Sequence, residues 1–242
     1  MNIQVGQKNH VFAVGALGLG LSCALISSAP AQAAIINGDF SSNFDGWDIF
    51  GFTSIVTPGG NPAAQLEAGA PDVTASVIET FLGLAPGSLE DLSGQTNELF
   101  DGSGALFLGS ALKQSFTANA GDIISFTYNF TTSDYLPFND FAFTTLSPLV
   151  EGLASVKLVG NTSGNTTSTG PRTFSWAIPT AGTYTLGFGV INVGDNLFGS
   201  TLVVDDVSST PIPTPALLPG LIGMGVAAWR KRQGEVEVSE EA

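Results

Sequence analysis

Acidic side chains are the groups in this sequence that could do chemistry. The 242 residues include 21 Asp or Glu against seven Lys or Arg, which gives a formal net charge of −14. The single histidine, His10, and the single cysteine, Cys23, lie near the N-terminus, in a segment that we expect to be removed. The remaining chain then lacks the residues for a Ser-His-Asp triad, a disulfide, or the usual zinc and haem ligand sets. Carboxylate catalysis and oxygen-ligated calcium remain.

The strong negative charge also restricts the partners of the folded part. Such a surface repels nucleic acid phosphates and anionic lipids, so we expect neither as a partner. It suits divalent cations and neutral ligands such as sugars.

The N-terminal residues 1–33 are typical of a secretory signal peptide. Lys8 precedes an apolar run over residues 11–26, and an Ala-Gln-Ala cleavage motif ends at Ala33. We therefore expect an exported protein that begins after Ala33. The alternative is an N-terminal membrane anchor, which the shortness of the apolar run disfavours.

A second targeting pattern lies in residues 211–232. The motif Pro213-Thr214-Pro215-Ala216 opens a short apolar run, and a basic cluster ends it: Arg230, Lys231 and Arg232. The pattern resembles the PEP-CTERM sorting signal of exosortase substrates, in its PTPA variant. It differs in being followed by an acidic tail, residues 233–242.

This resemblance implies one short C-terminal apolar helix that enters the membrane transiently, with the basic cluster on the cytoplasmic side. It also implies an exosortase-type membrane enzyme as partner. The processed protein would reach the cell surface, the outer envelope or the extracellular matrix. An ordinary single-span tail anchor is the alternative, but the run is shorter than the ~20 residues of a comfortable span.

Between the two signals, residues 34–210 are predicted to form one all-β domain. The stretches 123–130, 183–190 and 201–204 are rich in β-branched and aromatic residues and lie near turn-forming residues. Many strands without long helices between them favour an antiparallel β-sandwich. Two short helices are expected only around residues 74–93, where Ser76 and Glu79 have capping-box spacing.

The two ends of this domain resemble galactose-binding-like jelly rolls, which include carbohydrate-binding modules. "INGDFSSNFDGW" at residues 36–47 is similar to their opening strand, and "VDDV" at residues 204–207 is similar to their last. The middle of the domain resembles a group of secreted PEP-CTERM proteins from cyanobacteria.

The jelly-roll resemblance implies that the first and last strands are neighbours with a structural calcium ion close by. Asp39, with Asp205 or Asp206, would supply oxygen ligands. Because adjacent strand residues point to opposite faces, only one residue of the Asp205-Asp206 pair is expected to face the ion. The alternative is that all three are ordinary strand-end or turn acids.

The aromatic and acidic stretch over residues 132–140 is the candidate ligand-binding loop. Sugars stack on exposed Tyr or Trp rings, and Tyr135 is the candidate ring here. Trp47 and Trp176 are expected in the core. A packed loop position for Tyr135 remains the alternative.

Three classes of function stay open. The first is a non-catalytic surface or matrix protein defined by its sorting signal, the second a module that binds extracellular polysaccharide, and the third a carboxylate-based glycosidase. The glycosidase is the weakest, because a sandwich of this size offers no obvious deep cleft. A shallow groove with outward Trp or Tyr rings would favour sugar binding.

Overall fold

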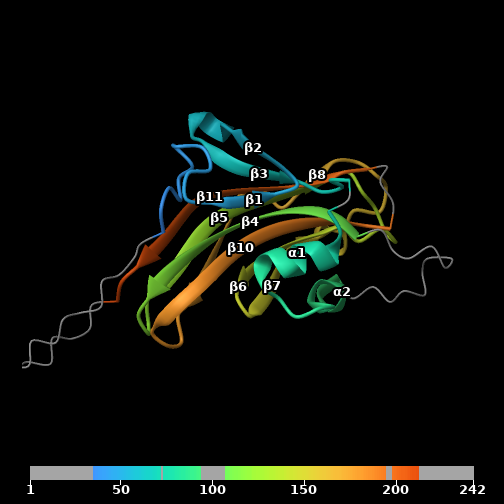
Figure 1. Ribbon diagram of the computed structural model, residues 1–242. Coiled ribbons are helices and arrows are strands. Elements are labelled where there is room, and N and C mark those ends of the chain that lie inside the picture. Colours follow the sequence, from blue (N-terminus) through green and yellow to red (C-terminus); the bar gives the residue numbers. More distant parts are fainter. Residues whose placement is uncertain (1–34, 72, 94–106, 195–197, 213–242) are drawn as a thin grey trace, which may run out of the picture. The chain divides into compact units, whose positions relative to one another are not determined.

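Two antiparallel β-sheets face each other in the computed structural model of the chain (Figure 1). The structure describes residues 35–71, 73–93, 107–194 and 198–212, and all of these belong to one compact unit. The strand order is β1-β4-β10-β6-β7 in the first sheet and β2-β3-β11-β5 in the second, where β8 and β9 both pair with β5. Every one of these pairings is antiparallel. The predicted jelly-roll sandwich is confirmed.

The strands have the following bounds. The first sheet contains β1 (Asp48–Phe50), β4 (Phe107–Ala118), β10 (Gly182–Val193), β6 (Phe141–Leu146) and β7 (Leu149–Ser155). The second sheet contains β2 (Phe52–Val56), β3 (Ala63–Glu67), β11 (Ser200–Thr210), β5 (Ile123–Thr132), β8 (Thr167–Ser168) and β9 (Arg172–Ala177).

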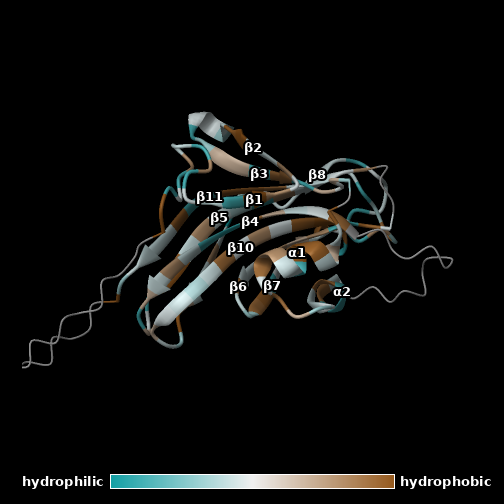
Figure 2. Cartoon of the chain, viewed as in Figure 1, coloured by the Kyte–Doolittle hydropathy of each residue, from teal (hydrophilic) through white to brown (hydrophobic). Residues whose placement is uncertain are grey.

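The space between the sheets is filled by one face of each central strand. Along β5, buried and half-buried residues alternate strictly, which places Phe126 and Phe130 inside and their neighbours outside. Phe126 meets Phe188 of β10 edge to face, with 4.7 Å between ring centroids. The hydrophobic bands along β10 are visible in Figure 2. This period of two is the reason that the strands could be predicted.

Two helices cover the outer face of the first sheet. α1 (Ala75–Leu82) and α2 (Ser88–Ser93) bury Ile78 and Leu89 in a second apolar cluster with Phe143 and Ile191 of β6 and β10. Every residue of β6 is buried, because the core lies on one side of it and this cluster on the other. Figure 1 shows both helices on this side. The first sheet is therefore enclosed between the core and the helices.

The expected helices are confirmed at residues 75–93, but three details were wrong. The N-cap of α1 is Thr74, not Ser76. Glu79 instead reaches the start of α2, where its carboxylate accepts from the main-chain N–H groups of Gly87 and Leu89. Short helices also occur elsewhere, as α3 (Val156–Val159) and the 3₁₀ turn η1 (Pro58–Gly60).

The expectation of neighbouring first and last strands was also wrong. Residues 36–46 form bends and turns, and β1 pairs with β4, whereas β11 pairs with β3 and β5. The opening loop still reaches the last strand, since the Val207 N–H donates to the Gly38 carbonyl at 2.9 Å. The two motifs meet, but through a loop.

The targeting segments fall beyond the part that the structure describes. The signal peptide at residues 1–33 and the sorting motif from Pro213 onward lie outside it, as does the acidic tail. Among the described residues, no helix combines the length and the apolar character needed to cross a membrane.

Candidate functional site

The outer face of the second sheet is the candidate functional site. No described helix covers it, in contrast to the first sheet. The residues that point outward from β2, β3, β11 and β5, which we call the open face, are half-buried or exposed: Phe52, Ser54, Gln65, Glu67, Thr201, Val203, Asp205, Thr127, Asn129 and Thr131. Six of these ten are the uncharged polar residues Ser, Thr, Gln or Asn. Such a face can form many hydrogen bonds without a strong charge.

Strand register aligns these residues in rows across the sheet, because directly opposed residues share a face. Val203 of β11 lies opposite Gln65 of β3 and Asn129 of β5. In the next row Thr201 lies opposite Glu67 and Thr131. The rows place polar groups from strands far apart in the sequence within reach of one extended ligand.

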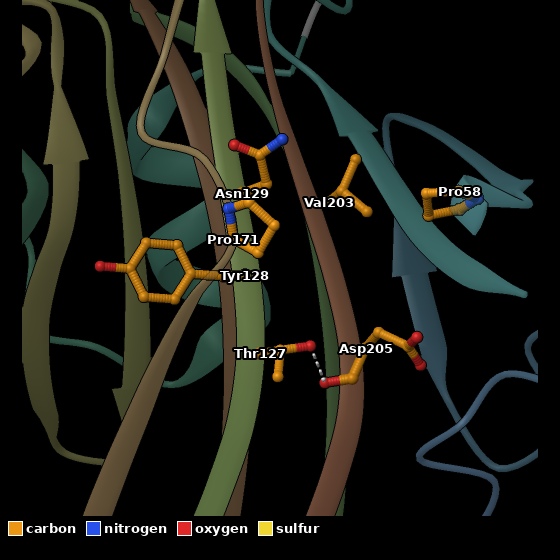
Figure 3. A pocket seen from close by; sticks show the side chains of 7 residues that line it. All are labelled: Pro58, Thr127, Tyr128, Asn129, Pro171, Val203 and Asp205. Carbon is orange, nitrogen blue, oxygen red and sulfur yellow. Dashed lines mark hydrogen bonds between the residues drawn. The ribbon is translucent and has the colours of Figure 1, made fainter. Parts of the chain in front are cut away.

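A groove of about 240 Å³ runs along β5 and β11 on the open face. Two proline rings border it, Pro58 from η1 and Pro171 just before β9, and its floor includes Val203 (Figure 3). Pyranose rings combine apolar C–H faces with a polar rim. An apolar floor with polar groups beside it is the environment that such a ring requires.

Hydrogen-bonding groups of both kinds line this groove. The Asn129 Oδ1 atom accepts from the hydroxyls of Ser168 and Thr169, which leaves its amide nitrogen on the opposite side as a donor. Asp205 supplies carboxylate oxygens two residues further along the neighbouring strand. A donor and an acceptor are thus held ~7–8 Å apart across adjacent strands.

Aromatic stacking in the groove does not follow the expected pattern. Tyr128 contributes to the lining, but its hydroxyl donates to the Leu153 carbonyl and Figure 3 shows its ring turned away from Val203 and Asp205. No outward Trp or Tyr ring lies among the described lining residues. The exposed ring of the open face is Phe52, at its edge on β2 and 50 % accessible.

Tyr135 lies at another end of the domain. It is half-buried in a loop after β5 and meets Phe138 and Phe198 edge to face, at 5.9 and 6.1 Å between centroids. Thr127 lies opposite Asp205, and β5 continues five residues from it to Thr132, so the loop begins ~16 Å along the strand from the Asp205 position. It begins ~10 Å from Asn129, the nearest groove residue on β5. The structure does not bring Tyr135 and the aspartates together. As expected, Trp47 is buried in the core, and Trp176 packs against it half-buried.

The aspartates proposed as calcium ligands meet only in part. Asp39 is exposed, and its carboxylate accepts hydrogen bonds from the main-chain N–H and the hydroxyl of Ser41. Both bonds lower the pKa of Asp39, the main-chain one more strongly. Burial raises the pKa of Asp205, the Asp206 N–H opposes this, and the charges of Asp206 and Asp39 raise it further. Asp206 has φ 54° and β11 shifts register between Asp205 and Ser208, so regular strand alternation does not apply here.

These residues offer calcium two carboxylates at most, those of Asp39 and Asp205. Among the described residues no group of three or more His, Cys, Asp or Glu side chains could hold a metal. Asp39 and Asp205 would therefore depend on main-chain or side-chain carbonyls and water for the six to eight oxygens that calcium takes. Such a site is expected to be weak.

Calcium at 10 mM is expected to raise the melting temperature of the purified protein by roughly 3–6 °C, if the dissociation constant is ~1 mM. The bound ion would relieve the repulsion between the Asp39 and Asp205 charges. Asp205→Asn should abolish the response, whereas Asp48→Asn on β1 should retain it. Equal melting with calcium and with chelator in the unmodified chain would show that the three aspartates are ordinary surface acids.

The groove residues themselves were not identified from sequence. The signal was present in the alternation of residues 123–132, where Thr127 and Asn129 occupy the polar positions between Phe126, Tyr128 and Phe130. This alternation shows that Thr127 and Asn129 point outward, but it does not show that Val203 and Gln65 lie beside them.

Comparisons with known proteins give no family for this chain. No family model matches the chain, and no curated protein matches it. Solved structures similar to it include TmCBM61 in complex with β-1,4-galactotriose, at TM-score 0.38 and 10 % identity over 75 % of this chain and 100 % of that one. A non-crystalline cellulose specific module, CBM28, aligns at TM-score 0.41 and 12 % identity over 75 % and 98 %. The mannan-recognising module TmCBM27 aligns at 0.33 and 14 % over 75 % and 98 %. At such low identity and TM-score the likeness transfers no residue role.

Proposed function

We propose that this chain is an exported, non-catalytic protein whose sandwich domain binds extracellular polysaccharide on the open face. The observation that carries the proposal is the uncovered polar face with its proline-bordered groove. The helices leave this face accessible while they enclose the other sheet. A neutral glycan suits it best, because the open face has carboxylates at Glu67 and Asp205 and no basic side chain.

Catalysis is not required by this arrangement. Glu67 and Asp205 lie on neighbouring strands four residues out of register, which separates them by ~13 Å along the strands. Glycosidase carboxyls lie ~5–9.5 Å apart.

The targeting signals supply the rest of the proposal. The leader sends the chain across the membrane, and the Pro-Thr-Pro-Ala segment with its basic cluster marks it for an exosortase-type enzyme. A glycan-binding domain released in this way would attach to polysaccharide at the cell surface, in the envelope or in the matrix. A structural surface protein without glycan affinity is the second candidate, and the absence of an outward Trp or Tyr ring in the described groove favours it.

Asn129→Ala is expected to weaken binding to the preferred neutral polysaccharide roughly tenfold, because the groove loses a donor worth about 1–1.5 kcal/mol. The measurement is retention on an array of immobilised neutral and uronate-containing polysaccharides, followed by a titration with the best one. Ser115→Ala, an exposed hydroxyl on β4 of the other sheet, should leave the affinity unchanged. Retention of the unmodified protein by no polysaccharide would refute the proposal and leave the structural role.

A further inference from the structure

A second cavity, of about 340 Å³, opens between the edges of the two sheets. β7 and the helix α3 that follows it form one wall, and residues 168–172, which run from β8 into β9, form the other. We call this cavity the side cleft. Among the described residues, it shares no lining residue with the groove of the open face. Its volume lies in the range of sites for small ligands.

Arg172 directs its side chain to the side cleft. It lies opposite Tyr128 in the pairing of β9 with β5, and directly opposed residues share a face of the sheet. The Tyr128 ring turns away from the groove of the open face (Figure 3), and its hydroxyl donates to the Leu153 carbonyl of β7. Burial raises the pKa of this hydroxyl, and the charge of Arg172 opposes that rise. Arg172 thus lies at the opening between the sheets, where it stays exposed.

The positive charges of the domain gather at this cleft. The described part of the chain has three basic side chains, those of Lys113, Lys157 and Arg172. Lys113 donates to a main-chain carbonyl of α1. Among the described residues, the Arg172 guanidinium has no hydrogen-bond or ion-pair partner, and Lys157 directly precedes Leu158, which lines the cleft. In a chain with a net charge of −14, this concentration favours an anionic ligand.

The rest of the cleft offers an apolar surface and a hydroxyl acceptor. Leu158 of α3 is 75 % exposed. On the opposite wall, the Ser168 hydroxyl donates to Asn129 Oδ1 and accepts from the Gly170 N–H. One lone pair of the Ser168 oxygen is left for a donor from outside. The cleft therefore combines a fixed cation, an apolar side chain and an acceptor for a hydroxyl group.

We propose that the side cleft binds a uronate residue of an acidic polysaccharide, with its carboxylate on Arg172, its C–H face on Leu158 and a ring hydroxyl on Ser168. The planar guanidinium matches a carboxylate through two parallel hydrogen bonds. An acidic peptide also carries carboxylates, but a uronate holds its carboxylate, an apolar face and hydroxyls on one rigid ring. This site is separate from the open face and does not depend on glycan binding there.

A galacturonate trimer, titrated into the purified protein at low ionic strength, is the probe for this site. Arg172→Gln should weaken its binding roughly tenfold or more, because the charge-assisted bonds are lost. Arg172→Lys should recover only part of the affinity, since an ammonium group cannot form the paired bonds. Glu151→Gln should tighten binding, because this exposed acid of β7 lies two residues from Leu153, ~7 Å along the strand.

Lys157→Gln is the matched control, since it removes the same charge from an exposed side chain beside the cleft. It should weaken binding by no more than about threefold, because a charge that does not touch the ligand is screened. Equal losses in Lys157→Gln and Arg172→Gln would overturn the proposal, since the attraction would then be general. An unchanged affinity in Arg172→Gln would also overturn it and place the ligand elsewhere, for example on the basic cluster at residues 230–232.

Two further ligands test the chemistry of the site. The methyl ester of the same trimer keeps the sugar rings but loses the charges, so it should bind roughly tenfold more weakly or not at all. A triglutamate peptide keeps the carboxylates without the rings and should also bind more weakly than the trimer. Equal binding of the ester, tighter binding of the peptide, or no binding of the trimer would each overturn the proposal.

Discussion

Gly38→Ala is expected to lower the free energy of unfolding by about 3 kcal/mol, a loss of roughly 6–12 °C in melting temperature. A Cβ atom on Gly38 would lie 1.8 Å from the carbonyl oxygen of Val207 and 2.8 Å from its carbonyl carbon. Both are main-chain atoms of β11, which cannot withdraw without disturbing its pairing with β5. The opening loop must therefore leave the last strand.

The loss extends beyond one contact because the same loop fills part of the core. Phe40 and Trp47 are buried, their ring centroids lie 5.4 Å apart, and Trp47 lies 6.0 Å from Phe188 of β10. Chemical denaturation followed by tryptophan fluorescence would measure the change. Gly199→Ala is the matched control, since a Cβ there meets no atom within 4 Å, and a change within about 0.5 kcal/mol is expected. Equal stability of the two variants would show that the loop does not anchor the domain.

The central strands could be predicted because their own residues specify them. In β5, buried apolar residues alternate strictly with more exposed polar ones, and Gly121 lies in the turn before it. β10 is rich in β-branched and aromatic residues and begins at Gly182. A strand buried on one side imposes this period whatever its partners are. Strand existence is thus a local property, whereas the pairing of Val203 with both Asn129 and Gln65 depends on segments more than 70 residues apart.

The opening motif was assigned to the wrong local structure for a physical reason. Asn37 and Asn43 adopt left-handed φ values of 51° and 56°, and the Asn37 side chain bonds to main-chain groups of Ser42, Asn43 and Asp45. Asn, Asp, Ser and Gly favour such turns. The many such residues in 37–46 indicate turns, which the structure has, whereas the jelly-roll resemblance predicted a strand.

Glu79 and Asp140 show why buried carboxylates escape sequence analysis. Both belong to a chain with many surface acids, and the environment that distinguishes them comes from other elements: the start of α2 for Glu79, and β10 with β11 for Asp140. Spacing suggested a capping role for Glu79 within its own helix. In the structure the Glu79 carboxylate instead binds main-chain N–H groups at the start of α2.

Processing at the sorting motif is expected to remove residues 233–242 from the exported protein completely. Trypsin cuts after Arg232, so an intact chain releases this peptide, and mass spectrometry should find none of it in surface or secreted material. The peptide 158–172, between Lys157 and Arg172, serves as the internal reference because it lies within the domain.

Replacing Pro213 and Pro215 by alanine should reverse this result. The variant keeps the apolar run and the basic cluster, so it should stay in the membrane fraction and yield residues 233–242 in amounts equal to the reference peptide. The sorting enzyme would then lack its motif, while the apolar run and the basic cluster would still insert the chain into the membrane. Glu237→Gln in the acidic tail is the matched control, and it should be processed as the unmodified chain is. If surface protein of the unmodified chain carries the 233–242 peptide at the level of the reference, the segment is a permanent anchor and not a sorting signal.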